Sequence, residues 1–430
     1  MAPTPPLPDQ ASELRRTSNR YMVLVLLLLV YIFNFADRVL LGVMATPIKN
    51  DLGLSDTHLG LLGGTAFALF YATLGVPIAW LADRHSRSWI ITMALVIWSG
   101  FTALCGLATN FLHLFLARLG VGIGEAGGVA PSYSLISDYF PPEERARALG
   151  FYSFGIPIGS ALGLAFGGLV ASMLDWRVAF IAMGIAGVAI APLFKALVRD
   201  PVRGGFEPQN SAQRPRLGDA LRLLKGKPSF WLLSLGSALA ATASYGVSFW
   251  IPSFYVRSFG LSLADVSMAY AALVLVGGVS GAWVGAWITD RFGPSRPASY
   301  VLVPVCAMLI SIPFYVAAVT ANSVLSSLVL LLIPTTLGSM GYGPILSAIQ
   351  HVSPPSLRTT SSAIFLLINN LIGLGLGSAA LGVISDTLVA RFAEDSLRYA
   401  LLAGTGFYVL SALLYSFASR LIARDWEIHR

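Results

Sequence analysis

Two charged residues lie seven positions apart in an otherwise apolar stretch, ARLGVGIGEAGG (residues 117–128). If this stretch is helical, Arg118 and Glu125 share one face, because seven residues turn a helix by about 700° and advance it by about 10 Å. A second charged pair, Asp37 and Arg38, lies in the apolar stretch NFADRVLLG. Ionisable groups in such surroundings pair with one another or face a cavity, so these four could exchange protons or bind an anion.

The same stretch contains GIGEAG (residues 122–127), which matches the GxGxxG pattern of dinucleotide-binding loops. That pattern has its usual meaning only after a strand and at the start of a helix, and no strand pattern precedes it here. We therefore exclude a nucleotide cradle. We expect the glycines to let another helix approach closely.

The depths of the charged residues suggest how they pair. At 1.5 Å per residue, Arg118 lies about 10 Å and Asp37 about 14 Å from the outer end of its helix. The two depths are comparable, so Asp37 is the expected partner of Arg118. Glu125 lies deeper, with no acidic neighbour and no assigned basic partner, which favours proton exchange near neutral pH. The alternative is a permanent ion cluster that locks the two helices together.

The elements that carry these residues are predicted to be membrane-spanning helices. The chain has 430 residues, of which 56% are hydrophobic and only 11% charged, with a mean hydropathy of +0.73. Lipid offers no partner to an open strand edge, so apolar runs of about 20 residues indicate helices and an all-α fold. Twelve such runs cover residues 21–46, 59–82, 89–109, 111–137, 147–172, 177–198, 229–256, 266–289, 298–319, 323–350, 359–385 and 398–421.

The basic residues orient these helices. Arg38 and Arg118 lie within helices, and most of the other basic residues of the 28 in the chain fall on the side of both termini. By the positive-inside rule both termini are cytoplasmic. The net charge of +7 then reflects topology and attraction to anionic headgroups, not nucleic acid. The opposite side holds Lys49, Arg177, Arg257, Arg391 and Arg398.

The longest polar connection divides the chain into two halves of six helices. We expect a disordered cytoplasmic N-terminus (1–20), an N-terminal bundle (21–198), a cytoplasmic linker (199–228), a C-terminal bundle (229–422) and a cytoplasmic tail (423–430). The first apolar run is too long for a signal peptide and is read as a retained helix. Composition rich in Arg over Lys favours a bacterial source, hence the inner membrane.

Two matches between the halves argue for a duplication. AWLADRHSR (79–87) recurs as AWITDRFGPSR (286–296), and PPEERARALGFY (141–152) aligns with PPSLRTTSSAIF (354–365). The second match places Arg145 opposite Arg358. Both matches fall at equivalent loops, in the same order.

The first of these loops resembles the G-x-x-x-D-R-x-x-R signature of the major facilitator superfamily, with Ala79 and Ala286 in place of the leading Gly. The resemblance implies parallel six-helix repeats around a central substrate cavity. It also implies that Asp83 and Asp290 lie at the inner mouth, each facing a helix N-terminus, an interaction worth about 0.3–1 kcal/mol. The implied inner gate further includes Arg84, Arg87, Glu143, Arg145, Arg291 and Arg358.

Four of the arginines near this gate are expected to pair with Glu143, Glu144 or lipid headgroups: Arg84, Arg87, Arg291 and Arg296. The alternative interpretation is that the charged loops only end the helices and fix the topology.

A narrower resemblance covers most of residues 30–170. NFADR followed by Gly42, RLGVGIGEA followed by Pro131, SDYFPPEERAR and FYSFGIPIGSALG are all similar to the Spinster-like branch of the superfamily. Members of that branch export lysolipids and sphingoid phosphates, some with proton coupling. The resemblance implies an anionic amphiphile as substrate, Asp37 and Glu125 as proton-coupling residues, and Arg38 and Arg118 as headgroup-binding residues.

The cavity of such a carrier would suit an apolar tail. The second half offers no charge at mid-span, only polar groups such as Asn369 and Asn370. Aromatic residues in membrane helices also serve as packing or interfacial anchors, so each could be either. The candidate lining residues are Tyr31, Phe67, Phe70, Tyr71, Phe154, Tyr245, Phe249, Trp250, Phe365, Asn369 and Asn370.

Other classes of protein find less support. No HExxH, GxSxG or Walker A sequence is present, so neither an enzyme nor an ATP-driven pump is indicated. Cys105 and Cys306 fall inside spans and suggest neither a disulfide nor a metal site. We expect a monomeric, proton-linked, alternating-access carrier with no cofactor. The rival interpretations are a proton-coupled carrier of small organic acids or drugs and, less favoured, a sensor that transports nothing.

Overall fold

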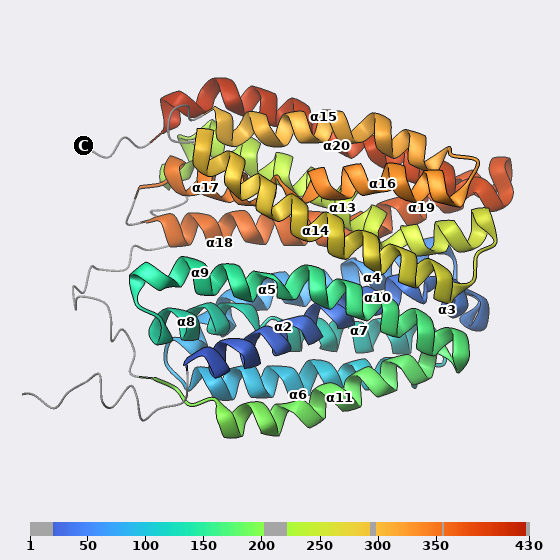
Figure 1. The fold of residues 1–430 in the computed structure, drawn as a ribbon, viewed down its shortest axis with the longest axis horizontal. Coiled ribbons are helices and arrows are strands. Elements are labelled where there is room, and N and C mark those ends of the chain that lie inside the picture. Colours follow the sequence, from blue (N-terminus) through green and yellow to red (C-terminus); the bar gives the residue numbers. More distant parts are fainter. Residues whose placement is uncertain (1–19, 202–221, 293–297, 355–356, 427–430) are drawn as a thin grey trace, which may run out of the picture.

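The computed structural model describes residues 20–201, 222–292, 298–354 and 357–426. These residues form helices and no strand, as predicted for an all-α chain. The helices run side by side in two bundles, one from α2 to α11 and the other from α13 to α20 (Figure 1). The expected disordered N-terminus, most of the expected linker, the end of the tail and Arg296 lie outside the described residues.

The N-terminal bundle begins with the long helix that carries Asp37 and Arg38. Side-chain caps mark several helix starts, since Asn110 accepts a bond from the His113 amide at 2.9 Å. Gly53 adopts φ 61° and ends α3 in the left-handed region. The helices are α2 (Arg20–Val43), α3 (Ala45–Leu52), α4 (Asp56–Gly63), α5 (Thr65–Ala82), α6 (Arg87–Cys105), α7 (Phe111–Glu125), α8 (Val129–Tyr139), α9 (Pro142–Ser153), α10 (Gly155–Met173) and α11 (Trp176–Leu197).

The C-terminal bundle repeats this plan with one irregularity. Between α18 and α19 the chain forms a π-helical turn, Asn369–Leu374, a feature that often marks functional sites. The helices are α13 (Pro228–Phe259), α14 (Leu263–Phe292), α15 (Ser299–Val319), α16 (Val324–Ser339), α17 (Tyr342–Val352), α18 (Arg358–Ile368), α19 (Gly375–Phe392) and, after a short 3₁₀ turn, α20 (Ser396–Asp425).

Ten stretches of the described residues are long and apolar enough to cross a membrane. One of them, Thr360–Asp425, contains two such rods, because the 3₁₀ turn Ala393–Asp395 separates α19 from α20. The predicted span 111–137 is not among the ten, because it is interrupted between α7 and α8. These two features account for the difference from the twelve predicted spans.

The glycines of GIGEAG cause that interruption and also permit close packing. The amides of Gly127 and Gly128 bond to carbonyls three residues back, at 3.1 and 3.0 Å, so the helix tightens and ends after Glu125. A side chain at Gly122 would collide with the backbone of Phe67, and one at Gly124 with the backbone of Trp98. The predicted role of the glycines in close helix approach is confirmed.

The internal repeat is visible as a shared contact. Arg145 Nε donates to the carbonyl of Ser137 at 3.1 Å, and Arg358 Nε donates to the carbonyl of Gln350 at 3.1 Å. In both halves the arginine reaches eight residues back, to the end of the preceding helix, and satisfies a carbonyl there. The predicted equivalence of Arg145 and Arg358 is therefore confirmed.

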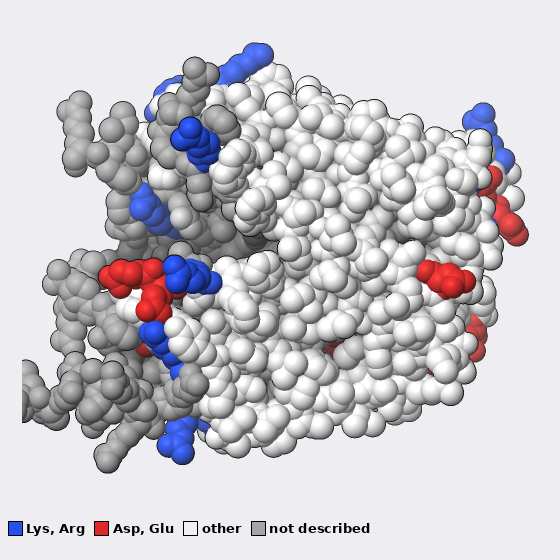
Figure 2. Space-filling view, viewed as in Figure 1, with Lys and Arg blue, Asp and Glu red and all other residues white. Residues whose placement is uncertain are grey.

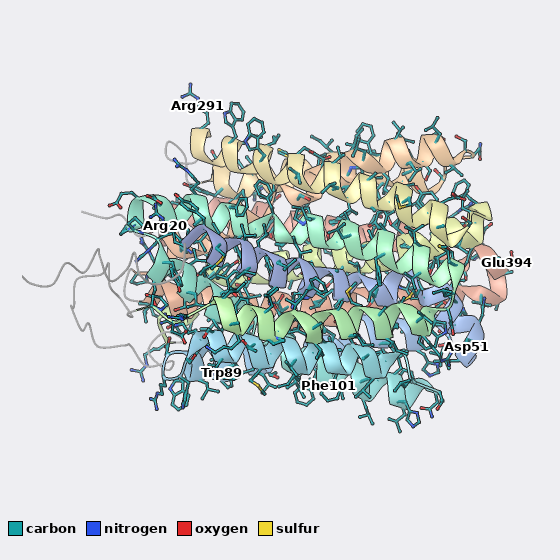
Figure 3. The ribbon with its side chains drawn as sticks, turned by 60° about the horizontal axis from the view of Figure 1, so that its bottom comes forward. Arg20, Asp51, Trp89, Phe101, Arg291 and Glu394 are labelled. Carbon is teal, nitrogen blue, oxygen red and sulfur yellow. The ribbon has the colours of Figure 1, made fainter. Side chains whose placement is uncertain are left out.

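The molecule has two distinct ends. Figure 3 places Arg20 and Arg291 at one end, here called the Arg20 end, and Asp51 and Glu394 at the other, the Asp56 end. Charged side chains gather at both ends and leave a broad, nearly uncharged band between them (Figure 2). The bundles pack through α4 on α19 and α10 on α14, whereas the surface between them is hollowed toward the Arg20 end (Figure 2).

Candidate functional site

A buried ion pair joins α2 to α7 in the middle of the N-terminal bundle. Arg38 Nε donates to Glu125 Oε2 at 2.6 Å, and the Glu125 side chain is fully buried. Arg38 is 10% exposed, so it is the more accessible member of the pair. The sequence left the basic partner of Glu125 open, and the structure assigns Arg38, because successive residues of α2 pair with different residues of α7.

A second ion pair lies beside the first. Arg118 Nη1 is 3.6 Å from Asp37 Oδ1, and both side chains are buried. The Thr102 hydroxyl, from α6, donates to Asp37 Oδ2. The predicted pairing of Asp37 with Arg118 is confirmed, and all four ionisable residues lie in one bundle.

Aromatic rings surround the Arg38 guanidinium. Its Cζ lies 4.4 Å from the ring centre of Tyr71 and 4.9 Å from those of Phe35 and Phe67. The ring centre of Phe67 also lies 5.4 Å from Cζ of Arg118, so one ring contacts both cations. Cation–π contacts of this kind hold a charge in place without neutralising it.

The four ionisable residues retain unused hydrogen-bonding capacity. Arg38 Nη2, Glu125 Oε1, Asp37 Oδ1 and two nitrogens of Arg118 are buried without a hydrogen-bond partner among the described residues. Unpaired buried polar atoms are costly, about 1–3 kcal/mol each, so a site that keeps them commonly serves a ligand or a proton. The arrangement can hold a proton on Glu125 or Asp37 and an anion on Arg38.

The predicted lining residues divide into two groups. Tyr71 and Phe67 contact Arg38, and Tyr245 of α13 interacts electrostatically with it from the other bundle. Phe249 packs against Gly42 and Gly63, where it fills the contact between the bundles. Asn370 is partly buried and Phe154 is 43% exposed.

Other predicted lining residues lie in packed surroundings. Trp250 is fully buried and donates to the Ser378 carbonyl at 2.9 Å, and Phe365 is fully buried in the core of the C-terminal bundle. Asn369 accepts a bond from Ser237 at 2.8 Å inside the π-helical turn. Phe70 is partly buried on α5, and Tyr31 stacks on Tyr152 with ring centres 4.3 Å apart.

The predicted inner-gate residues lie at the Arg20 end. Arg87 forms an ion pair with Asp138, and Glu144 Oε2 is 3.2 Å from Arg20 Nη2. Arg87 and Glu144 therefore do not form the expected pair with each other. Both ion pairs lie within the N-terminal bundle. Cζ of Arg84 lies 3.7 Å from the ring centre of Trp80.

The other predicted inner-gate residues are mostly exposed. Asp83, Glu143 and Arg291 are exposed at helix ends. The side chain of Asp290 lies outside what the structure describes. Arg145 and Arg358 make the symmetrical carbonyl contacts given above.

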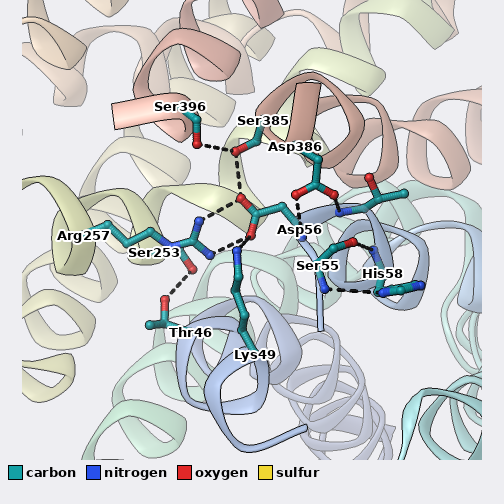
Figure 4. Close-up of polar contacts among 11 residues, drawn as sticks. Thr46, Lys49, Ser55, Asp56, His58, Ser253, Arg257, Ser385, Asp386 and Ser396 are labelled. Atoms are coloured by element: carbon teal, nitrogen blue, oxygen red, sulfur yellow. Dashed lines mark hydrogen bonds and ion pairs between the residues drawn. The ribbon is translucent and has the colours of Figure 1, made fainter. Parts of the chain in front are cut away.

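At the opposite end, a cluster that the sequence analysis missed joins the two bundles. We call Lys49, Asp56, Arg257, Ser385 and Asp386 the Asp56 clamp (Figure 4). Arg257 holds the buried Asp56 carboxylate with two bonds of 2.8 and 2.9 Å, and Ser385 donates to it at 2.7 Å. Lys49 adds a 2.6 Å ion pair from the same bundle as Asp56.

The clamp is completed by a carboxylate at a helix start. Asp386 accepts bonds from the amides of Asp56 at 3.1 Å and Thr57 at 2.8 Å, the first residues of α4. A helix N-terminus favours a negative charge, so Asp386 stabilises the closed contact. In the sequence these residues resemble ordinary loop charges; the only available signal was that Lys49 and Arg257 interrupt a side otherwise poor in basic residues.

The described residues offer no group of three or more His, Cys, Asp or Glu side chains that could hold a metal ion. Cys105 and Cys306 are both free.

Comparison with known proteins gives a consistent family. Residues 27–378 match the Major Facilitator Superfamily. An "MFS-type efflux pump" of Mycolicibacterium smegmatis is 32% identical over 400 residues, which cover 93% of this chain and 92% of that protein. "Protein spinster homolog 1" of Homo sapiens is 29% identical over 414 residues, covering 89% of this chain and 77% of that protein.

A solved structure agrees with these relatives. It is described as a bacterial homologue of the human lysosomal transporter Spinster in an inward-facing and unoccupied conformation. It is 32% identical, covers 96% of this chain and 99% of its own, and superimposes with a TM-score of 0.87.

Proposed function

Since the chain belongs to the major facilitator superfamily and has the fold of a multi-pass, Spinster-like membrane transporter, we propose that it is a proton-coupled secondary transporter of an anionic amphiphile. The observation that carries this proposal is the Arg38–Glu125 pair, in which Glu125 is fully buried and Arg38 faces the contact between the bundles. A lysophospholipid or sphingoid phosphate would supply the anionic group, and the aromatic surroundings would suit its tail.

The chemistry follows from competition for Arg38. While Glu125 is ionised, its carboxylate occupies the Arg38 guanidinium at 2.6 Å. A proton on Glu125 removes that charge and frees Arg38 to bind the phosphate or carboxylate of a substrate. Asp37 and Arg118 form the second pair of the same site, so a proton on Asp37 would release Arg118 in the same way.

The orientation of the carrier is part of the proposal. We assign the Arg20 end to the cytoplasm, because Lys and Arg side chains gather there (Figure 2). The Asp56 clamp then closes the outer side while the hollow faces inward, in keeping with the description of the 32% identical relative. Alternating access requires the clamp to open and the inner gate around Asp83, Asp290 and their arginines to close. The bacterial inner membrane is the proposed location, and one chain is the proposed functional unit.

The test is transport in proteoliposomes with radiolabelled lysophosphatidylglycerol and an imposed pH gradient. We compare the wild type with Glu125→Gln, and use Glu394→Gln, an exposed carboxylate at the Asp56 end, as the matched control. We expect gradient-driven flux in the wild type and the control, and at least a tenfold loss in Glu125→Gln. Equal flux with and without the gradient would refute proton coupling.

A second candidate is a carrier of drugs or small organic acids. It is favoured by the 32% identity to a protein described as an efflux pump. Gradient-driven flux of a cationic dye or a small acid, without flux of the lysolipid, would establish this candidate in place of the first.

A further inference from the structure

The N-terminal bundle contains a small cavity. It lies next to the Arg38–Glu125 pair, on the side of the Arg20 end. Its lining residues come from α2, α6, α8, α9 and the α7–α8 interruption; they include Tyr31, Asn34, Trp98, Gly128, Ser132 and Tyr152. Five of these residues carry polar side-chain groups, which makes the cavity suitable for water.

Asn34 is the unusual member of this lining. Its side chain is 2% exposed, and neither its amide nitrogen nor its oxygen has a hydrogen-bond partner among the described residues. Leaving such a group unpaired costs about 1–3 kcal/mol per polar atom, and buried amides are normally satisfied by protein or by ordered water. A water molecule in the cavity would satisfy both atoms of the amide.

The cavity lies one helical turn from the ion pairs on both of its walls. On α2, Asn34 precedes Asp37 by three residues and Arg38 by four, which places these side chains on one helix face. At the interruption, the Gly128 amide bonds to the Glu125 carbonyl at 3.0 Å. Water at Asn34 would therefore lie about one helical turn from Glu125, whose Oε1 has no hydrogen-bond partner among the described residues.

Hydroxyl groups continue the path away from the ion pairs. Tyr31 is hydrogen bonded to Tyr133, which is 43% exposed, and Tyr152 is hydrogen bonded to Ser132. Tyr133 thus gives the buried hydroxyls a contact with the surface.

From these observations we propose that Tyr133, Tyr31 and water held by Asn34 form a proton relay that connects bulk water at the Arg20 end to Glu125. Each hydroxyl or water accepts one proton and donates another, and the transferred proton ends on the Glu125 carboxylate. Asn34 does not ionise and is a positioning residue for the water. The proposal rests on the proposed function.

The relay ends among charged groups. Arg38 contacts Glu125 directly, while Asp37 and Arg118 act on it electrostatically from α2 and α7. Tyr71 of α5 and Tyr245 of α13 lie against Arg38, and Tyr152 closes the far wall. The three tyrosines of the relay region and these groups are the titratable residues that face the path.

The water site is tested first by radiolytic hydroxyl-radical labelling of the wild-type protein. Trp98 lines the cavity and Trp250 does not, although both are fully buried. Radicals form from nearby water, so we expect Trp98 to be oxidised at least fivefold faster than Trp250. Equal, slow oxidation of the two residues would show a dry cavity and overturn the proposal.

The relay itself is tested by transport of radiolabelled lysophosphatidylglycerol. We expect Asn34→Leu to lower pH-gradient-driven flux at least tenfold and to leave substrate exchange at equal pH within twofold, while Asn34→Ser retains gradient-driven flux. Unchanged driven flux in Asn34→Leu would overturn the relay. Absence of any gradient effect in the wild type would instead refute the proposed coupling. If Asn34→Leu does not fold, the labelling ratio in the wild type decides.

Discussion

The two buried ion clusters of this transporter differ in what they connect. The pairs Arg38–Glu125 and Asp37–Arg118 lie within one bundle, whereas the Asp56 clamp joins α4 of one bundle to α13 and α19 of the other. The first cluster can change its protonation without separating the bundles. The second cannot survive their separation at the Asp56 end. In the proposed mechanism, charge sensing and mechanical closure thus lie at different points of the molecule.

The largest expected effect comes from breaking the first cluster. Arg38→Ala leaves Glu125 buried without a cation, and loss of one member of a buried pair typically costs about 3–5 kcal/mol. We expect flux to fall at least 100-fold and the thermal unfolding temperature to drop. The double variant Arg38→Ala with Glu125→Gln should recover most of the stability but no transport. Recovery of transport in the double variant would contradict a role of the pair in coupling.

Breaking the Asp56 clamp should change the distance between the two bundles more than it changes the stability of either bundle. Asp56→Asn weakens the contact with Arg257, so we expect the Asp56 end to open. Spin labels at Met173 and Glu394, both exposed at that end, report the distance between bundles once Cys306 is replaced by Ser.

The matched control for the clamp is Asp51→Asn. It removes a 2.5 Å ion pair with Arg177 at the same end but within one bundle. A longer distance in Asp56→Asn and an unchanged one in Asp51→Asn are expected. The same distance in all three proteins would show that the clamp does not hold the closed state.

Arg145 and Arg358 occupy equivalent positions, so substituting each in turn compares the two bundles directly. Arg145→Gln and Arg358→Gln each remove charge-assisted bonds to carbonyls at a helix end, worth about 1.5–3 kcal/mol each. We expect similar decreases in unfolding temperature, measured by differential scanning fluorimetry in detergent. A loss of transport without a loss of stability would instead assign these residues to the inner gate.

The smallest effect is expected at Asp200, which belongs to neither cluster. Partial burial opposes its ionisation, but hydrogen bonds from Ser86 and Ser88 outweigh that cost and hold the pKa of the carboxyl below its usual value. Its stabilising contribution is therefore present above the unfolded pKa of about 3.9 and lost as the pH falls through the folded pKa.

Asp200→Asn should accordingly lower the unfolding temperature by about 1–3 °C at pH 7. The difference from the wild type should shrink as the pH is lowered below about 4. A difference that is constant with pH would show that the hydrogen bonds do not depend on the charge of Asp200. This variant provides the baseline against which pH effects of the buried clusters are judged.

Local patterns in the sequence predicted the helices, the repeat and the Asp37–Arg118 pair, because each depends on periodicity or on depth along a helix. The pairing of Arg38 with Glu125 was not predicted, since it depends on the rotation of α2 against α7. The Asp56 clamp was missed for another reason. Asp56, Arg257 and Asp386 lie about 130 to 330 residues apart, and only the packing of the two bundles brings them together. Tertiary contact of this kind has no local signature in a single sequence.

The π-helical turn at Asn369–Leu374 has a consequence for the register of α19. A π turn holds one more residue than an α turn, and one residue corresponds to a rotation of about 100° around the helix axis. All side chains beyond Leu374 are rotated by that amount relative to an uninterrupted helix. Ser378, Ser385 and Asp386 face α4 because of this single extra residue. A one-residue deletion in the turn would therefore turn the whole contact surface of α19 away from its partner while leaving every side chain of the clamp in the chain.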